Sequence, residues 1–82
     1  MKVTDRKKRI FDYSKLKGRI AEKGYRAYDV AEASGMTPTT YSQKLNNNWG
    51  FTQYEICSIC QFLEIDTADI PLYFFTQKVQ NN

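Results

Sequence analysis

Apolar residues recur along this chain at helical spacing, in short segments separated by polar or glycine-containing turns. No stretch of useful length alternates apolar and polar residues as a half-buried strand does, and no internal repeat occurs. The pattern therefore predicts an all-α fold of about five short helices. They are expected to span residues 13–24, 27–34, 38–45, 52–64 and 67–75.

Residues that commonly begin or end helices support these bounds. Thr37 is a suitable N-cap before a proline, which costs no hydrogen bond at the first helical position. Thr52 and Glu55 have the spacing of a capping box, and Thr67 is expected to cap the last helix. Residue types that tolerate left-handed backbone are expected to end three helices, at Gly24, Gly35 and the run 46–48 of asparagines.

The apolar positions of these helices predict the core. The inward stripes include Leu16, Ile20, Val30, Ala31, Met36, Tyr41, Leu45, Ile56, Ile59, Cys60 and Leu63. Tyr73, Phe74 and Phe75 cannot all point into one core from one helix, so at least one is expected at the surface or in a homodimer interface. Alternatively, the tail folds back and covers them. Trp49 either closes its loop over the core or lies against a sugar–phosphate backbone.

Charge is unevenly distributed along the 82 residues, which suffice for one small domain. Residues 1–26 contain ten Lys and Arg against three Asp and Glu, a net charge of +7, whereas residues 27–82 carry −4. From residue 33 to residue 54 there is no Asp or Glu, and Thr, Ser, Gln and Asn are frequent. Such a surface suits a negatively charged partner that displays base edges. A chance gap in a polar region would give the same pattern.

Several classes of function are disfavoured by composition. The chain has no histidine, which excludes histidine-based acid–base catalysis and histidine metal ligands. Cys57 and Cys60 form a C-x-x-C pattern, but a redox site of that kind needs a βαβ context that is absent, so the pair is interpreted as part of a helix stripe. We therefore expect no enzyme, cofactor, metal or small-molecule ligand. Without a long apolar run or a signal peptide, we expect a cytoplasmic protein with no membrane partner.

The segments 27–34 and 38–45 surround a tight turn at Gly35, which is the layout of a helix-turn-helix. A small residue, Ala31, allows the two helices to cross closely, and Val30, Met36 and Tyr41 fill the space between them. From Ala27 to Asn46 the sequence resembles the helix-turn-helix of the Cro and phage-repressor family, which implies a lambda-repressor-like fold. The segments 11–16 and 73–80 resemble short regulators encoded by phages and prophages of Gram-positive bacteria.

This resemblance implies a DNA interface on the third predicted helix. In that family the exposed start and middle of this helix contact bases. Here these positions are occupied by Thr39, Thr40, Ser42 and Gln43. The family's phosphate-contacting positions and their neighbours are occupied by Arg26, Ala27, Tyr28, Lys44, Asn46 and Asn47. Gln43 is the best candidate for reading a base, because a carboxamide pairs bidentately with adenine. The chain departs from the family at Ala27, where glutamine is common, and at Pro38, where another residue often reads a base.

The sequence thus predicts a sequence-specific double-stranded DNA-binding protein, a Cro-like transcriptional regulator and most simply a repressor. We expect a basic flexible arm over 1–9, the helix-turn-helix domain over 10–75 and a C-terminal tail over 76–82. A homodimer would read two half-sites about one helical turn apart. The alternative is a protein-binding module, similar to an antirepressor or an antitoxin, that uses its aromatic C-terminal surface.

Overall fold

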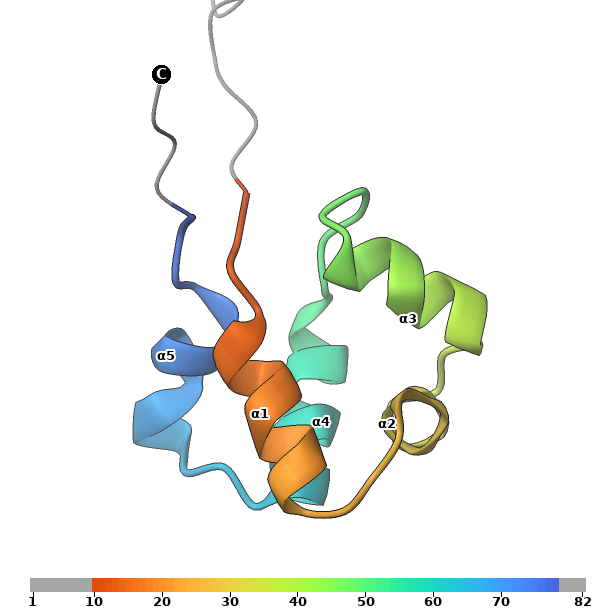
Figure 1. The fold of residues 1–82 in the computed structure, drawn as a ribbon, viewed down its shortest axis with the longest axis horizontal. Coiled ribbons are helices and arrows are strands. Elements are labelled where there is room, and N and C mark those ends of the chain that lie inside the picture. The colour runs from red at the N-terminus through yellow and green to blue at the C-terminus, as the bar shows by residue number, and fades with distance from the viewer. Residues whose placement is uncertain (1–9, 79–82) are drawn as a thin grey trace, which may run out of the picture.

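The computed structural model describes residues 10–78. The basic arm predicted over 1–9 and the end of the predicted tail, 79–82, lie outside these residues. The helices are α1 (Ser14–Glu22), α2 (Ala27–Ala33), α3 (Pro38–Leu45), α4 (Gln53–Leu63) and α5 (Ile70–Phe74), with a 3-10 turn η1 (Thr67–Asp69) before α5 (Figure 1). The described residues form no strand, only an isolated antiparallel bridge between Phe11 and Gln77. The all-α prediction is confirmed.

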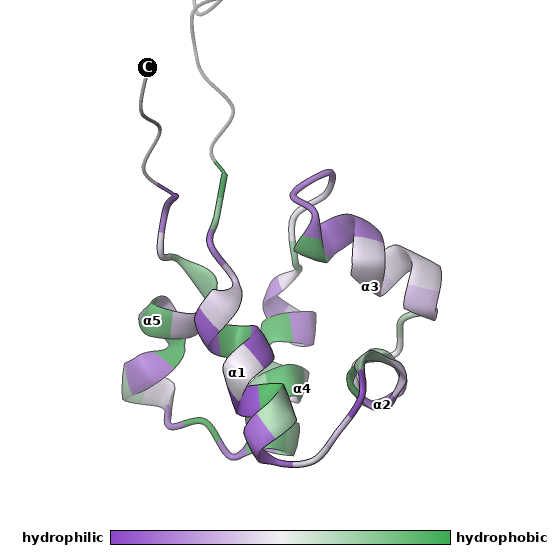
Figure 2. Cartoon of the chain, in the orientation of Figure 1, coloured by the Kyte–Doolittle hydropathy of each residue, from purple (hydrophilic) through white to green (hydrophobic). Residues whose placement is uncertain are grey.

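The helices form two groups around one core. In Figure 1, α1 lies in front of α4 with α5 beside them, and α2 and α3 form the other half. The core consists of Tyr13, Leu16, Ile20, Val30, Ala31, Met36, Tyr41, Ile59, Cys60, Leu63, Ile65 and Phe74. Figure 2 shows α4 and α5 mostly in the hydrophobic colour and most of α3 in hydrophilic or neutral colours. The helix that is predicted to contact a partner therefore contributes little apolar surface.

Local hydrogen bonds explain where most helices begin. The Thr37 hydroxyl accepts the Thr40 N–H at 3.1 Å. Thr52 and Glu55 form the predicted capping box, with bonds of 3.1 and 2.9 Å. The cap predicted at Thr67 is wrong, because η1 begins with no side-chain cap. Proline at 71 cannot donate to the Thr67 carbonyl, so the N–H of residue 70 does, and the turn tightens to 3-10.

Left-handed residues follow four of the helices. Gly24 and Gly35 have φ values of 80° and 77°, as predicted. Asn47, in the predicted asparagine run, has φ 67°, and Glu64 has φ 57°. Glu64 was predicted to be helical, but α4 ends one residue earlier. The Arg19 guanidinium donates there to the carbonyls of residues 63 and 64, both at 3.1 Å, and so satisfies the free end of the helix.

The segment before α1 pairs with the segment after α5. The Asp12 N–H donates to the Thr76 carbonyl at 2.7 Å, and the Lys78 N–H donates to the carbonyl of residue 10 at 2.8 Å. Of the aromatic cluster, Phe74 is buried, whereas Phe75 is 52% exposed and packs edge-on against Phe11. The segment after α5 thus pairs with the N-terminal segment without covering Phe75, so the prediction that at least one of these aromatic residues lies at the surface is confirmed. In the part of the chain that the structure describes, no helix is long and apolar enough to span a membrane.

Candidate nucleic-acid interface

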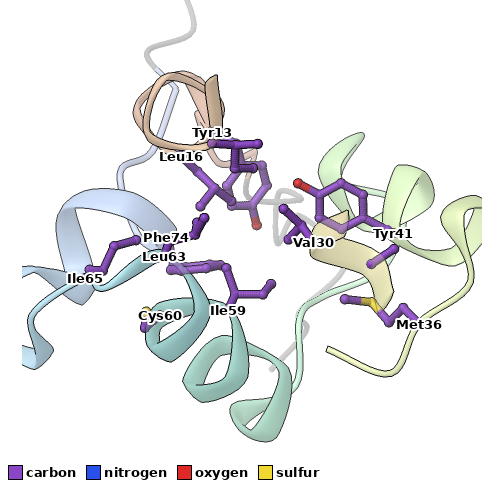
Figure 3. Packing of buried hydrophobic residues seen from close by; sticks show 12 residues of the cluster. Tyr13, Leu16, Val30, Met36, Tyr41, Ile59, Cys60, Leu63, Ile65 and Phe74 are labelled. Carbon is purple, nitrogen blue, oxygen red and sulfur yellow. The ribbon is translucent and has the colours of Figure 1, made fainter. Parts of the chain in front are cut away.

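The turn between α2 and α3 fixes the direction of α3. Gly35 supplies the left-handed backbone, and the Met36 N–H donates to the Ala31 carbonyl at 2.8 Å. Ala31 is fully buried and brings the two helices into close contact. Figure 3 shows Val30, Met36 and Tyr41 around α2 and α3 at one end of the buried cluster, and all three are buried as predicted. The geometry is that of two short helices around a glycine turn.

The predicted base-contacting residues all lie on α3, but they differ in solvent exposure and in the hydrogen bonds of their side chains. Thr39 and Ser42 are exposed, whereas Thr40 and Gln43 are half-buried. The Thr40 hydroxyl lies 3.1 Å from the Thr37 hydroxyl. The Gln43 carbonyl oxygen accepts the Asn48 side-chain N–H at 2.6 Å. Because an amide oxygen has two lone pairs, this bond orients Gln43 and leaves both its amide hydrogens available.

Lys44 does not have the position that the resemblance implies. Its side chain is buried, with 8% of the residue exposed, and its ammonium contacts both oxygens of Glu55 at 2.7 and 2.8 Å. Burial by itself would raise the pKa of Glu55, but the Lys44 bonds and the Thr52 N–H outweigh it, and the pKa is lowered. The expected phosphate contact of Lys44 is corrected to an internal ion pair, because this lysine faces α4.

Asn47 also has an internal role. Its amide oxygen accepts the Phe11 N–H at 2.8 Å, and its amide nitrogen donates to the Phe11 carbonyl at 3.0 Å. The side chain thus pairs with the backbone of a residue 36 positions away, as a neighbouring strand would. Asn47 therefore clamps the N-terminal segment, and its amide nitrogen keeps a second hydrogen, so its phosphate contact stays a prediction.

The other predicted phosphate-contacting residues are accessible. Arg26, Ala27 and Tyr28 are exposed at the start of α2, and Asn46 is exposed at the end of α3. The backbone N–H of Arg26 donates to the Asp29 carboxylate at 2.8 Å, which caps α2 and leaves the guanidinium outside the cap. These four residues remain candidates for contact with a partner.

Two exposed aromatic residues follow α3, and the sequence predicted only one of them, Trp49, as an alternative contact with a sugar–phosphate backbone. Trp49, in the loop between α3 and α4, is 56% exposed and does not close over the core. Tyr54, in the first turn of α4, is 84% exposed. The signal for Tyr54 was present in the sequence, because it lies outside the apolar stripe of its helix.

The two cysteines have unequal environments. Cys57 is exposed and Cys60 is buried in the core, and both are free thiols. Burial, with a smaller effect of Cys57, raises the pKa of Cys60 to about 11. A protonated buried thiol is a poor nucleophile and a poor metal ligand, which favours the interpretation of Cys60 as part of the core. Within residues 10–78 no group of three or more His, Cys, Asp or Glu could hold a metal ion.

The fold and the exposed face of α3 define a class of protein. It is a small all-α domain in which α2 and α3 surround a glycine turn and α3 displays a polar face. A family model matches residues 9–77, and the chain belongs to that family, described as "Protein of unknown function (DUF739)". Comparison with curated proteins gave no match.

The solved structures that are similar to this chain include two regulatory proteins. One is the solution structure of the modulator of repression of the temperate bacteriophage TP901-1 from Lactococcus lactis. It is 41% identical, has a TM-score of 0.69, and the match covers 85% of this chain and 95% of that one. The other is the crystal structure of the clp gene regulator ClgR from C. glutamicum. It is 25% identical, has a TM-score of 0.61, and the match covers 73% of this chain and 78% of that one.

These similarities confirm the predicted resemblance to small phage-type regulators at a coarse level. Both similar structures are regulatory proteins, and neither is an enzyme by its name. The matching family model is not that of the Cro and phage-repressor proteins. Membership of that finer group therefore stays a prediction.

Proposed function

We propose that this chain is a small transcriptional regulator that binds double-stranded DNA, with α3 in the major groove. The observation that carries the proposal is the face of α3 that presents Thr39, Ser42 and the oriented Gln43. The stretch from residue 33 to residue 54 has no carboxylate to repel DNA. An α-helix fits a major groove about 12 Å wide, where each base pair displays a distinct pattern of donors and acceptors.

Each residue of this face has a chemical role in the proposal. Gln43 has the donor and acceptor that adenine requires, and its bond to Asn48 reduces the side-chain freedom lost on binding. Thr39 offers a hydroxyl to a base edge and a methyl group to a thymine methyl. Arg26 and the N–H groups at the start of α2 would contact a phosphate on the near strand.

The two similar proteins support a regulatory role. One is named a modulator of repression and the other a gene regulator. For this chain we propose control of transcription of the same general kind, most simply by occupying an operator. A homodimer on a two-fold symmetric site remains part of the proposal, because it would double the contacts made by one short helix.

The test is selection of duplexes from a random-sequence pool, followed by titration of the enriched duplex. Thr39→Ala and Gln43→Ala are expected to lower affinity for that duplex, with losses of ~1–3 kcal/mol for each base contact. Thr67→Ala and Gln61→Ala are matched controls, because they make the same changes at exposed positions of η1 and α4. The proposal is wrong if the chain binds no duplex at low salt, or if the controls weaken binding as much as the α3 variants.

A second function, binding to another protein, is favoured by the C-terminal surface. Phe75 and Leu72 are half exposed, and a small apolar pocket of about 100 Å³ opens between Phe75, Phe11 and Phe51. Aromatic residues are enriched in protein interfaces. A chain that modulates repression through this surface would act on a regulator rather than on an operator.

Mutation separates the two functions. Phe75→Ala changes the exposed ring, whereas Phe74 is buried and its truncation would cost ~3–5 kcal/mol of stability. If Phe75→Ala abolishes regulation in cells while the protein stays folded, and Thr39→Ala and Gln43→Ala have no effect, the protein-binding function is correct. The opposite result supports DNA binding through α3.

A further inference from the structure

A polar pocket lies where the N-terminal segment, the first turns of α1 and the end of α3 meet. Its volume is about 230 Å³, whereas one water needs only ~10–15 Å³ on the same measure, so a tetrahedral anion fits with several waters. The lining residues that matter here are Asp12, Ser14, Lys17, Asn46, Asn47 and Lys78. Neither Lys17 nor Lys78 is among the contact residues predicted from the sequence. The two lysines are far apart along the chain, and only the tertiary structure brings them to one pocket.

Tertiary hydrogen bonds hold the walls of this pocket together. Asn47 pairs with the backbone of Phe11 through both side-chain polar atoms. The Lys78 N–H donates to the carbonyl of residue 10 at 2.8 Å, which places this lysine beside the N-terminal segment. These bonds join the end of α3 to the N-terminal segment, and Lys17 and Lys78 line the same pocket.

The charges of the pocket do not cancel. Asp12 is the one carboxylate among the lining residues, and it accepts the Ser14 N–H and hydroxyl at 2.9 and 2.6 Å. These bonds lower the pKa of Asp12, with smaller contributions from Lys78 and Lys17. Neither lysine forms an ion pair with a residue that the structure describes. Two ammonium groups against one carboxylate leave one positive charge, and a phosphodiester carries one negative charge.

We propose that this pocket binds one phosphate of the DNA backbone, with Lys17 and Lys78 as its cations and the Asn46 amide as a further donor. The inference rests on the proposed function. The eight residues of α3 span ~12 Å, close to the width of the major groove, so a helix that crosses the groove brings its last residue near a groove edge. With Lys44 committed to Glu55, the pocket replaces the contact that the sequence assigned to that lysine.

The test measures how DNA affinity depends on salt. The double variant Lys17→Gln/Lys78→Gln is compared with Lys15→Gln/Lys23→Gln, which removes the same charge from the first turn of α1 and from the residue directly after that helix. Lys15 lies over the Tyr73 ring and Lys23 pairs with an exposed glutamate, so neither lines the pocket. Loss of one phosphate contact lowers the slope of log affinity against log salt by ~0.9. That reduction is expected in the pocket variant on every duplex sequence, and the control should keep the wild-type slope.

A second measurement distinguishes DNA from a free anion. Inorganic phosphate is titrated while amide NMR shifts of Ser14, Asn46 and Asn47 are followed in the wild type and in Lys17→Gln/Lys78→Gln. A pocket variant with the wild-type salt slope overturns the proposal. If phosphate nevertheless shifts these amides in the wild type and not in the variant, the pocket is a site for a free anion only. Wild-type protein that binds no DNA overturns the proposed function together with this inference. A wild-type protein that binds DNA while the pocket variant keeps its slope overturns this inference alone. Thermal melts of each variant show whether a loss reflects unfolding.

Discussion

Replacing Lys44 with methionine is expected to lower the free energy of unfolding by about 2–3 kcal/mol at pH 7. The side chains of Lys44 and Glu55, which form this ion pair, are only 10% and 15% exposed. Removing one partner of a buried pair costs ~3–5 kcal/mol, because the other charge stays buried. Water still reaches the edge of this pair, so the expected cost lies at the bottom of this range or slightly below it. Methionine keeps the apolar contacts of the lysine stem, so packing changes little.

That loss is large for a domain of this size. Eighty-two residues correspond to a total stability of ~4–12 kcal/mol, and each kcal/mol shifts the melting temperature by ~4–8 °C. We therefore expect the melting temperature to fall by roughly 10–20 °C, measured by circular dichroism and by urea unfolding with an unchanged m-value. Lys23→Met is the control, because it removes a lysine from an exposed pair with Glu64 and should change stability far less.

The pH dependence gives a second test of the same reasoning. Lys44 holds the pKa of Glu55 below its ordinary value of 4.5, so the stabilisation is present above that pH and is lost as pH falls through the folded pKa. The gap between wild type and Lys44→Met should therefore be widest near neutrality and close in acid. The reasoning is refuted by a gap under about 0.5 kcal/mol at pH 7, or by one that does not narrow below pH 4.

Three further changes test other parts of the structure. Tyr41→Phe removes a buried hydroxyl that has no hydrogen-bond partner, and it should raise stability by ~1 kcal/mol in urea unfolding; a loss of that size would reveal a hidden partner. Because burial raises the pKa of Tyr41 to about 12, the wild type should lose stability as pH rises above 10, where the unfolded tyrosine ionises, and Tyr41→Phe should lose less. Asn47→Gly keeps the left-handed backbone but removes both bonds to Phe11; it should cost ~1–2 kcal/mol and speed amide exchange at Phe11, and unchanged exchange would contradict the clamp. A thiol reagent at pH 8 should modify Cys57 quickly and Cys60 only on unfolding, as its raised pKa and burial require, and equal rates would contradict the buried position.

The candidate site was predictable only where a residue's surroundings are local. The exposure of Thr39 and Ser42 follows from their place on α3 outside the stripe of Tyr41 and Leu45, which faces the core. Lys44 was assigned to a phosphate by its position in the family pattern, but its partner lies in the next helix, 11 residues along the chain. A long flexible side chain at the edge of a helix face can turn either way, and only the neighbouring helix decides which.

The sequence by itself determined the helices, because caps, turns and apolar stripes depend on residues within about four positions of one another. It predicted α3 at its observed bounds, the caps at Thr37 and Thr52, and the left-handed glycine between α2 and α3. The tertiary structure alone decided that Asn47 clamps a segment 36 residues away and that Lys17 and Lys78 share a pocket. Contacts of that kind join groups that no local pattern relates, so their pairing depends on how the helices pack.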